Sequence, residues 1–448
     1  MMKVALISPK GNMFGKNNRL VSFLENSKYM ESFKTLWTGP NLGLLTIAAS
    51  FPDDWECEYI DENRIPINFE SDYDIVFISA MTQQAQRAYE IAETYRSKGI
   101  LTVMGGIHAT VMPEEASQHI DVVLVGEGEA LWPKFIKDLQ NNNLHKIYTD
   151  ANKGSYDLKN SPMPRYDLLR NYEYLLITIQ TTRGCPHDCS FCAASKVFGA
   201  SYRRKSNEQI LKEINEISKL YPGTLILFAD DNAFVNRREA KELLKNMIGM
   251  NLRWIAQTDI SIASDKELLE LMVRAGCQWI VIGFESVSKS SLHNLDAANW
   301  KLGQINKYKE SIQIIQEYGI GVYGTFIVGL DNDDRDIFRA TSNFILDNKL
   351  YGANITVPTP LPGTQLREKL LNENRVLEMD WSYYTLWDIV ISPKKMTLIE
   401  LEDGLIDLYY RINTNVSAEK RLIYLRQLTK NRRKYEAAIS KEGEGGYR

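Results

Sequence analysis

The chain has 448 residues, which is too long for one ordinary domain, and about two or three domains are expected. Hydrophobic residues make up 44% and charged residues 25%, so the chain should be globular throughout. Because 53 basic and 57 acidic side chains leave a net charge of −4, nucleic acid is not a favoured partner.

The first residues carry no sign of a signal peptide. Met1-Met2-Lys3 leads directly into the apolar run 4–9, which is far too short for the apolar part of such a peptide. No later apolar run approaches the roughly 18 residues that a membrane-spanning helix needs. We therefore expect a cytoplasmic protein without a membrane span.

Residues 3 to about 140 alternate short apolar runs with helical patterns, which is typical of a doubly wound, Rossmann-like α/β domain with a parallel sheet. Ligands of such sheets bind beyond the carboxyl ends of the strands, where backbone amides and helix N-termini collect. The expected strands are 3–9, 56–61, 75–80, 100–105 and 121–126, and the expected helices are 41–50, 82–98 and 129–140.

Glycines follow two of these strands. Gly105-Gly106 follows the fourth strand and Gly126-Glu127-Gly128 the fifth, whereas Met81-Thr82-Gln83 follows the third. A glycine after one strand is more often turn chemistry, but glycines at two strand ends favour a site where a large ligand approaches the backbone. No G-x-G-x-x-G follows the first strand, which disfavours a nicotinamide or flavin dinucleotide.

A second α/β region is expected at 173–370. Residues 1–145 would form the N-terminal domain, and the polar, proline-containing stretch 146–172 predicts a linker rather than a packed element. Six βα units suit a partial TIM-like (β/α)6 barrel, whose catalytic residues gather at the C-terminal strand ends. Ser206 and Gln209 form a capping box before its first helix. The expected strands are 174–180, 224–229, 253–257, 279–284, 321–328 and 354–358, and the expected helices are 207–220, 237–249, 265–275, 302–318 and 334–349.

Three of the five cysteines lie within eight residues, Cys185, Cys189 and Cys192, with the spacing C-x3-C-x2-C. They follow the apolar run 174–180, so the thiols should lie in a loop at the end of a strand. Thiolates are the usual ligands of iron–sulfur clusters, and a four-iron cluster held by only three thiolates keeps one iron open. An open metal position can bind a substrate.

Zinc and a disulfide are the alternatives. A structural zinc site needs four ligands, and Cys57 and Cys277 lie far from the motif in the sequence. His187 could be a fourth ligand, but three thiolates and an imidazole would have to converge from one very tight loop. An odd number of thiols argues against a disulfide.

The cysteine motif, with Phe191 directly before its last cysteine, resembles the signature of the radical S-adenosylmethionine (SAM) enzymes. The resemblance implies that Cys185, Cys189 and Cys192 ligate a 4Fe–4S cluster whose open iron chelates SAM, and that an electron from the cluster cleaves SAM to a 5′-deoxyadenosyl radical. Such cysteines also call for a reducing compartment. The segment Arg203-Arg204-Lys205-Ser206 resembles the basic segment after the cluster loop of these enzymes, although a solvated basic turn explains it equally well.

The segments 40–45, 104–109 and 121–129 closely resemble the cobalamin-binding domain joined to many radical SAM enzymes. The resemblance implies that their loops hold the corrin ring, with the loop from Met81 beside its lower face. The D-x-H-x-x-G element of methionine-synthase-type domains is absent, so we expect no histidine ligand to cobalt and expect His108 to be a loop residue bonded to backbone. The implied cobalamin contacts are Ser8, Pro9, Asn41, Leu42, Ser79, Met81, Thr82, Gln83, Gly105, Gly106, His108, Gly126, Glu127, Gly128 and Glu129.

Polar residues also follow the expected barrel strands. Asp230 and Asp231 follow the second of them, and either can pair with the α-ammonium of SAM or serve only as turn residues. Later strands end in groups suited to ribose hydroxyls, in an acid, and in an apolar stretch with a glycine suited to adenine. The implied SAM contacts are Phe191, Asp230, Asp231, Gln257, Glu285, Ser286, Val328 and Gly329.

The C-terminal part of the chain predicts helices. Residues 371–437 should form a helical region that caps the barrel, including the aromatic segments 381–384 and 405–410. A short basic run at 430–434 is more often a solvated helix end than a contact with anionic lipid. Residues 438–448 are glycine-rich and charged, and we expect them to be disordered.

The resemblance implies a cobalamin-dependent radical SAM enzyme, most simply a C-methyltransferase that moves methyl from SAM through methylcobalamin to an unactivated carbon. A non-methylating member that forms or rearranges rings, or couples carbons, is the first alternative, and a non-catalytic cobalamin sensor is the second. An external electron donor such as ferredoxin or flavodoxin is implied. The substrate stays open among small molecules, lipids and peptide side chains.

Overall fold

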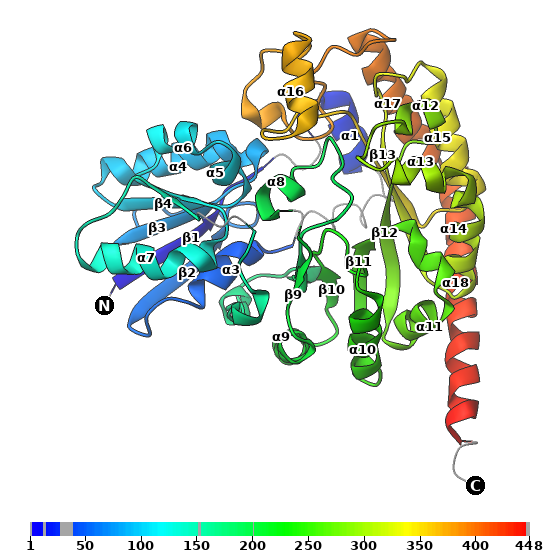
Figure 1. Cartoon of the computed structure of the whole chain (residues 1–448), viewed down its shortest axis with the longest axis horizontal. Helices are drawn as coiled ribbons and strands as arrows, with labels where there is room; N and C mark the ends of the chain where they lie inside the picture. The colour runs from blue at the N-terminus through cyan, green and yellow to red at the C-terminus, as the bar shows by residue number, and fades with distance from the viewer. Residues whose placement is uncertain (1, 12–14, 27–38, 151–153, 200, 445–448) are drawn as a thin grey trace. The chain divides into compact units, whose positions relative to one another are not determined.

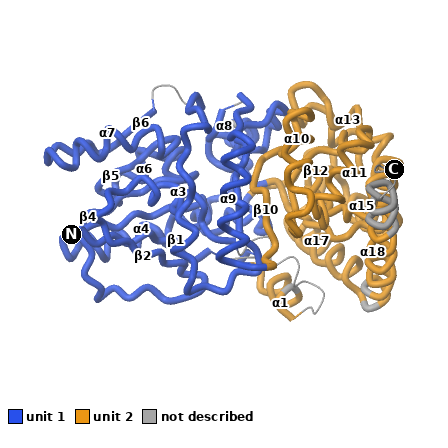
Figure 2. Tube along the Cα trace, turned by 90° about the horizontal axis from the view of Figure 1, so that it is seen from below, with its two compact units in different colours: residues 1–16, 38–222, 359–390 blue, residues 17–37, 223–358, 391–448 orange. Residues whose placement is uncertain are grey.

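The computed structural model describes residues 2–11, 15–26, 39–150, 154–199 and 201–444. It divides into two compact units, which Figure 2 colours separately. Unit 1 comprises Met1–Lys16, Thr38–Pro222 and Thr359–Val390, and unit 2 comprises Asn17–Trp37, Gly223–Pro358 and Ile391–Arg448. The domain boundaries expected from the sequence differ from this division and stay a prediction.

Among its described residues, unit 1 contains a parallel sheet of six strands in the order β2-β1-β3-β4-β5-β6. Strands buried on both faces form because β-branched and aliphatic residues follow one another without polar interruption, as in β3. The strands are β1 (Met2–Ser8), β2 (Trp55–Asp61), β3 (Ile75–Ser79), β4 (Leu101–Gly105), β5 (Val122–Val125) and β6 (Ile147–Thr149). The first five confirm the strands that the sequence predicts.

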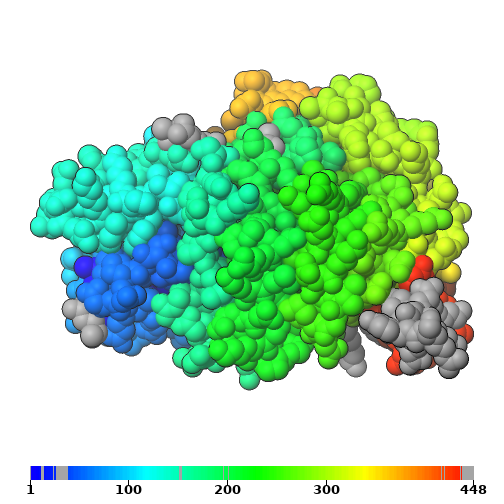
Figure 3. All heavy atoms as spheres, turned by 60° about the horizontal axis from the view of Figure 1, so that its bottom comes forward, coloured from blue at the N-terminus to red at the C-terminus, as the bar shows by residue number. Residues whose placement is uncertain are grey.

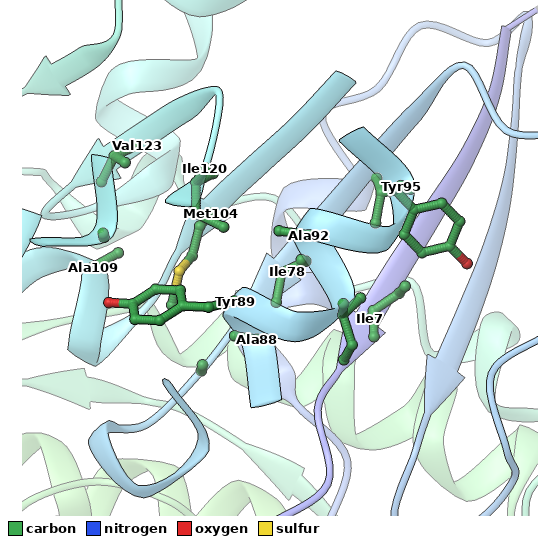
Figure 4. Close-up of a cluster of buried hydrophobic side chains, with 14 of the residues drawn as sticks. Ile7, Ile78, Ala88, Tyr89, Ala92, Tyr95, Met104, Ala109, Ile120 and Val123 are labelled. Carbon is green, nitrogen blue, oxygen red and sulfur yellow. The ribbon is translucent and has the colours of Figure 1, made fainter. Parts of the chain in front are cut away.

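Helices cover both faces of this sheet, with α4 and α6 on one side and α3 and α7 on the other (Figure 1). Asn41 starts α3 because its side chain accepts a hydrogen bond from the N–H of Leu44. Figure 4 shows the apolar side chains that α4 packs against β1, β3 and β4, including Ile7, Ile78 and Met104. The helices are α3 (Leu42–Ala48), α4 (Ala85–Ser97), α5 (Ile107–Val111), α6 (Pro113–His119) and α7 (Gly128–Gln140).

The expected linker at 146–172 is wrong in one respect, because it contains packed structure. β6 pairs in parallel with β5, with Ile147 opposite Val123. Leu158, Tyr166 and Leu169 are also buried. A strand of three residues is too short to show an alternation that sequence reading can detect.

Unit 1 also holds the cysteine loop and the elements around it. Ser206 caps α9 and Gln209 completes the capping box, as predicted. The elements are β7 (Leu176–Ile179), β8 (Thr182–Arg183), α8 (Ala194–Phe198), β9 (Arg203–Arg204), α9 (Asn207–Leu220) and α16 (Gln365–Asn372).

Unit 2 contains strands in the parallel order β14-β13-β12-β11-β10, and helices follow them along the chain. The helices α10 and α11 each bury one side, and their other side forms part of the green surface in Figure 3. The strands are β10 (Leu225–Phe228), β11 (Arg253–Thr258), β12 (Cys277–Glu285), β13 (Gly321–Ile327) and β14 (Gly352–Thr356). The helices are α1 (Asn18–Asn26), α10 (Arg237–Met247), α11 (Lys266–Arg274), α12 (Lys289–Leu292), α13 (Trp300–Gln304), α14 (Tyr308–Glu317) and α15 (Asp336–Asp347).

The C-terminal region is helical only in part. The expected helix at 405–410 lies within α17 (Leu398–Ile412), but Trp381–Tyr383 forms a single 3-10 turn. That turn belongs to unit 1. In the same unit, the carboxylate of Asp388 accepts hydrogen bonds from the backbone N–H of Lys16 at 2.9 and 2.8 Å. Of the tail 438–448 expected to be disordered, residues 438–444 belong to α18 (Asn415–Glu444), residues 445–448 lie outside the described residues, and the expectation stays a prediction.

No helix within the described residues is both long enough and apolar enough to cross a bilayer.

Candidate cofactor site

The cysteine loop begins directly after β8, and Gly184 allows it to turn. Gly184 has φ +91°, and a Cβ atom there would lie 2.3 Å from the backbone oxygen of Ser201, so only glycine fits. The N–H of Cys192 donates to the carbonyl of Cys189 at 3.0 Å, which closes a turn between the last two cysteines. Leu366 at the start of α16 donates its N–H to the carbonyl of Ser190 at 2.9 Å. The loop is therefore held by backbone contacts at several points.

The thiols of this loop fit a cluster better than the two remaining thiols do. Cys185, Cys189 and Cys192 are partly exposed, whereas Cys277 is buried in β12. Burial raises the pKa of the Cys277 thiol and also that of Cys57, which disfavours the thiolate form that binds metal.

The donor set does not resemble a one-ion site. Among the described residues, no three His, Cys, Asp or Glu side chains are grouped to hold a single metal ion. A four-iron cluster makes no such demand, because each thiolate binds a different iron. The three loop thiols match the number of protein ligands of such a cluster, and their role as its ligands stays a prediction. The zinc alternative with His187 gains no support from the described part of the chain.

A buried ion-pair network lies at the base of the loop. Arg183 donates to Glu127 at 2.6 Å and to Glu129 at 2.7 Å, and Arg203 donates to Glu127 at 2.7 Å. Burial alone would raise the pKa of Glu129, but the charge and hydrogen bonds of Arg183 outweigh it and leave that pKa below its usual value. The two glutamates that the sequence suggests as cobalamin contacts are therefore paired with arginines on both sides of the cysteine loop.

The glycines after the sheet strands differ in what they permit. Gly106 has φ +89°, and a Cβ atom there would lie 2.7 Å from Ser79 Oγ, so the protein itself requires glycine. Gly126 has φ +105°, which side chains rarely adopt. A Cβ atom on Gly105 would meet nothing nearer than Leu124 Cβ at 3.9 Å. At Gly105 an added Cβ atom would make only an ordinary van der Waals contact, so the protein's own packing leaves room for a side chain there, which fits a position that a large ligand approaches.

Other predicted cobalamin contacts gather at the same edge of the sheet. Ser79 of β3 lies opposite Gly105 of β4, and the amide of Asn41 donates to the carbonyl of Ser79 at 3.3 Å. Gln84 Nε2 donates to the carbonyl of Pro9 at 2.6 Å, which joins the loops after β1 and β3. Of the other predicted contacts, Ser8 and Thr82 are buried, Leu42 and Gln83 are partly exposed, Gly128 begins α7, and Met81 is 46% exposed.

The expectation for His108 is wrong, because it lies in α5 and its side chain bonds to other side chains. Its Nε2 lies 2.9 Å from the hydroxyl of Tyr89, which donates to Glu115 at 3.1 Å. Trp381 also donates to Glu115, at 2.7 Å. The imidazole is fully buried, and its Nδ1 has no hydrogen-bond partner among the described residues. Sequence reading missed Glu115 and Trp381, since no local pattern links residues so far apart.

In unit 2, polar residues after β10 and β11 contact one another. Asn232 Nδ2 donates to Asp259 at 2.8 Å, and Thr258 Oγ1 donates to Asn232 Oδ1 at 3.2 Å. Asp230 is buried, Asp231 is partly exposed, and Gln257 is exposed. Asn232, Thr258 and Asp259 are therefore in contact at these two strand ends, whereas the SAM contacts expected from Asp230, Asp231 and Gln257 stay a prediction.

Two further carboxylates lie at the ends of β12 and β13. Glu285 has φ +61° and forms a buried ion pair with Lys301 Nζ at 3.0 Å. Asp333 accepts the N–H groups of Gly329 at 3.1 Å and Leu330 at 3.0 Å. The sequence analysis did not identify Lys301 or Asp333. Of the other predicted SAM contacts, Ser286 and Val328 are buried, and Phe191 in the cysteine loop is partly buried.

Comparison with known proteins agrees with the motifs. Residues 179–345 match the model of the radical SAM superfamily, and residues 34–135 match the model of the B12 binding domain. The chain is 28% identical over 390 residues to bacteriochlorophyllide d C-12(1)-methyltransferase from Chlorobaculum tepidum, covering 85% of this chain and 84% of that protein. It is also 28% identical over 370 residues to the anaerobic magnesium-protoporphyrin IX monomethyl ester cyclase from Cereibacter sphaeroides. That match covers 75% of this chain and 59% of the cyclase.

A solved structure shows the fold. The radical SAM methyltransferase TsrM from Kitasatospora setae, with cobalamin and a 4Fe–4S cluster bound, matches with a TM-score of 0.63 at 14% identity, covering 92% of this chain and 81% of that one. The predicted fold class, a cobalamin-binding Rossmann-like domain followed by a radical SAM partial barrel, is thereby confirmed. With the B12 model matched ahead of the radical SAM model in a single chain, this protein belongs to the cobalamin-dependent radical SAM enzymes, which use a 4Fe–4S cluster, SAM and cobalamin.

Proposed function

We propose that this enzyme is a C-methyltransferase that moves a methyl group from SAM, through cobalamin, to an unactivated carbon. The observation that carries the proposal is the similarity to the bacteriochlorophyllide methyltransferase over 85% of this chain. The packing around Gly105, which leaves room for a side chain, and the three partly exposed thiols of the cysteine loop support it, since cobalamin and the cluster each need a binding site.

When bound, the cluster supplies the electron that splits SAM, and cobalamin supplies the methyl group. Replacing a C–H hydrogen by methyl in this way consumes two molecules of SAM and two electrons for each product. The products are the methylated carbon, 5′-deoxyadenosine, methionine and S-adenosylhomocysteine. Since the reaction consumes electrons, an external donor such as ferredoxin or flavodoxin is part of the proposal.

Specific residues are assigned to these groups. Cys185, Cys189 and Cys192 would hold the cluster, and Asp231 with its neighbours after β10 and β11 would bind the ammonium and ribose of SAM. The loops after β1, β3, β4 and β5 would contact cobalamin, and His108 would not ligate cobalt, because its imidazole is buried against Tyr89 and Glu115. The thiol set favours a reducing compartment, and the cytoplasm stays a prediction.

The magnesium-protoporphyrin cyclase among the relatives supports a second candidate, a non-methylating reaction that forms a ring. The non-catalytic sensor is no longer an alternative, because the radical SAM model and the named relatives show an enzyme. The names of both relatives concern tetrapyrroles, so tetrapyrroles are the first acceptors to test.

The two candidates differ in their products. Anaerobically reconstituted full-length enzyme would be incubated with SAM carrying a deuterated methyl group, a reductant and a panel of tetrapyrroles. A methyltransferase yields S-adenosylhomocysteine and 5′-deoxyadenosine in equal amounts together with a labelled acceptor. 5′-Deoxyadenosine without S-adenosylhomocysteine, and an unlabelled altered acceptor, would refute methyl transfer and support the second candidate.

A further inference from the structure

Two arginines close the base of the cysteine loop. β8 and β9 form a two-residue antiparallel ladder in which Arg183 lies opposite Arg203. Like charges placed opposite each other destabilise such a pair, and a ladder this short has little else to hold it. Glu127 Oε1 lies between them, accepting from Arg183 at 2.6 Å and from Arg203 at 2.9 Å. One carboxylate therefore joins the two ends of the loop.

Glu129 extends this contact. It accepts from Arg183 Nη2 at 2.7 Å and from the hydroxyl of Ser161 at 3.1 Å. The side chains of Arg183, Glu127, Glu129 and Arg203 are only 9%, 2%, 7% and 12% exposed, so solvent screens these pairs little. Two guanidinium groups and two carboxylates leave the group without net charge.

Arg203 also reaches into the loop itself. Its Nη2 donates to the carbonyl of Phe198 at 2.6 Å, at the end of the short helix that follows the cysteines. Its Nη1 donates to the carbonyl of Tyr156 at 2.9 Å. The network thus contacts the segment before the cysteines, the segment after them, and the loop that follows β5.

We propose that Glu127 and Glu129 are positioning residues that fix the cysteine loop, and with it the cluster, to the end of β5. The part concerning the cluster rests on the proposed function, which assigns that cluster to the loop. A buried ion pair adds little net stability compared with apolar residues, but removing one partner leaves an uncompensated charge. Such a network is better suited to fixing geometry than to stabilising the fold.

The test compares variants at two buried ion pairs of the same unit. Glu127→Gln and Glu129→Gln each remove one carboxylate of the network. The control, Glu213→Gln, breaks the buried pair of Lys205 and Glu213, whose side chains are 4% and 2% exposed. Each variant is made in the full-length chain, loaded with cluster anaerobically and mixed with a ferrous chelator, while the visible absorbance of the cluster is followed.

We expect cluster loss to accelerate at least about tenfold in the two network variants, because removing one member of a buried pair exposes its charged partner to hydration and opens the loop. The control should keep the wild-type rate even if its melting temperature falls as far. Glu127→Asp keeps the charge and should lose its cluster at a rate between wild type and Glu127→Gln. Equal acceleration in the control would overturn the proposal, because loss of stability alone would then explain the effect.

Hydrogen exchange separates this proposal from the proposed function. In the full-length chain before cluster loading, amides of residues 186–198 should exchange faster in Glu127→Gln than in wild type or Glu213→Gln. Unchanged exchange there would overturn the proposal even if the wild-type loop binds iron normally. A wild-type chain that binds no iron would instead refute the proposed function, and exchange would still decide the role of the glutamates. If Glu127→Gln does not fold, Arg203→Lys, which keeps the charge but loses the fork, takes its place.

Discussion

Asp333 is a buried carboxylate whose ionisation should lower the stability of unit 2. It is 2% exposed and accepts hydrogen bonds from the N–H groups of Gly329 and Leu330 and from the hydroxyl of Ser291. Desolvation raises the pKa of Asp333 from 3.8 to about 6, although these hydrogen bonds act in the opposite direction. The folded chain therefore binds this proton more tightly than the unfolded chain does.

The sign and size of the effect follow from linkage. The stability that the protonated group contributes is fully present below the unfolded pKa of 3.8 and is lost as the pH rises to about 6. Two pKa units correspond to ~3 kcal/mol. With ~2.1 cal/mol/K per residue, unfolding all 448 residues carries ~0.9 kcal/mol/K, so the melting temperature should fall by ~3 °C over this range. Unit 2 melting alone would show a larger fall.

Asp333→Asn removes the ionisation and keeps the hydrogen bonds. The amide oxygen can accept from Gly329 and Leu330 while its NH2 group donates to the oxygen of Ser291. We expect the variant to melt ~3 °C above wild type near pH 7.5 and the difference to vanish near pH 4. Melting curves of the cluster-free full-length chain, recorded by circular dichroism over this range, measure it. The exposed Asp336 at the start of α15 provides the control variant Asp336→Asn. A difference between Asp333→Asn and wild type that does not change with pH would refute the reasoning.

Three other predictions concern the cofactors. Replacing all cysteines of the loop 185–192 by alanine should reduce the iron bound after reconstitution from about four per chain to almost none, whereas Cys57→Ala should keep it, as iron assays would show. Asp231→Ala should weaken SAM binding and slow formation of 5′-deoxyadenosine without altering the cluster spectrum, and unchanged cleavage would make this aspartate a turn residue. Gly105→Val should fold normally and fail to bind cobalamin, as measured by the absorbance of the bound cofactor. Gly106→Val should instead unfold the domain because the new side chain would meet Ser79. Tight cobalamin binding by Gly105→Val would contradict the assigned site.

Most strands could be predicted from the sequence because parallel strands are buried on both faces and read as continuous apolar runs. The expected strand 75–80 is β3 (Ile75–Ser79), and the expected 56–61 is β2 (Trp55–Asp61). β6 was missed because its three residues give no period, and its place depends on pairing with β5. The 3-10 turn at Trp381–Tyr383 was expected to be helix because aromatic residues at this spacing also fit a helix face.

The candidate site also has parts that the sequence predicts and parts that only the structure shows. The cysteine motif and the apolar run 174–180 before it are both local, so together they predict the loop and its place after a strand. The partner of Glu127 is Arg183, 56 residues further along the chain, and the partner of Trp381 is Glu115, 266 residues earlier. No local pattern shows such pairs, because they depend on how the chain folds back on itself. The glycines after two strands predicted which edge of the sheet binds a ligand. Only the structure shows that a side chain has room at Gly105 and would clash with Ser79 at Gly106.

Several buried charged groups lie after strands in both units. Ionised groups are costly to bury, so a fold selected for stability alone would replace them with apolar side chains. In unit 1 such groups follow β5, at Glu127 and Glu129, and in unit 2 they lie at the ends of β12 and β13, at Glu285 and Asp333. The carboxyl ends of parallel strands are also where ligands of α/β sheets bind. The pair of Lys205, directly after β9, and Glu213, within α9, is also buried, so burial of charge alone does not identify a site. Glu127 and Glu129 differ from that pair because they follow β5 and bind the arginines that flank the cysteine loop.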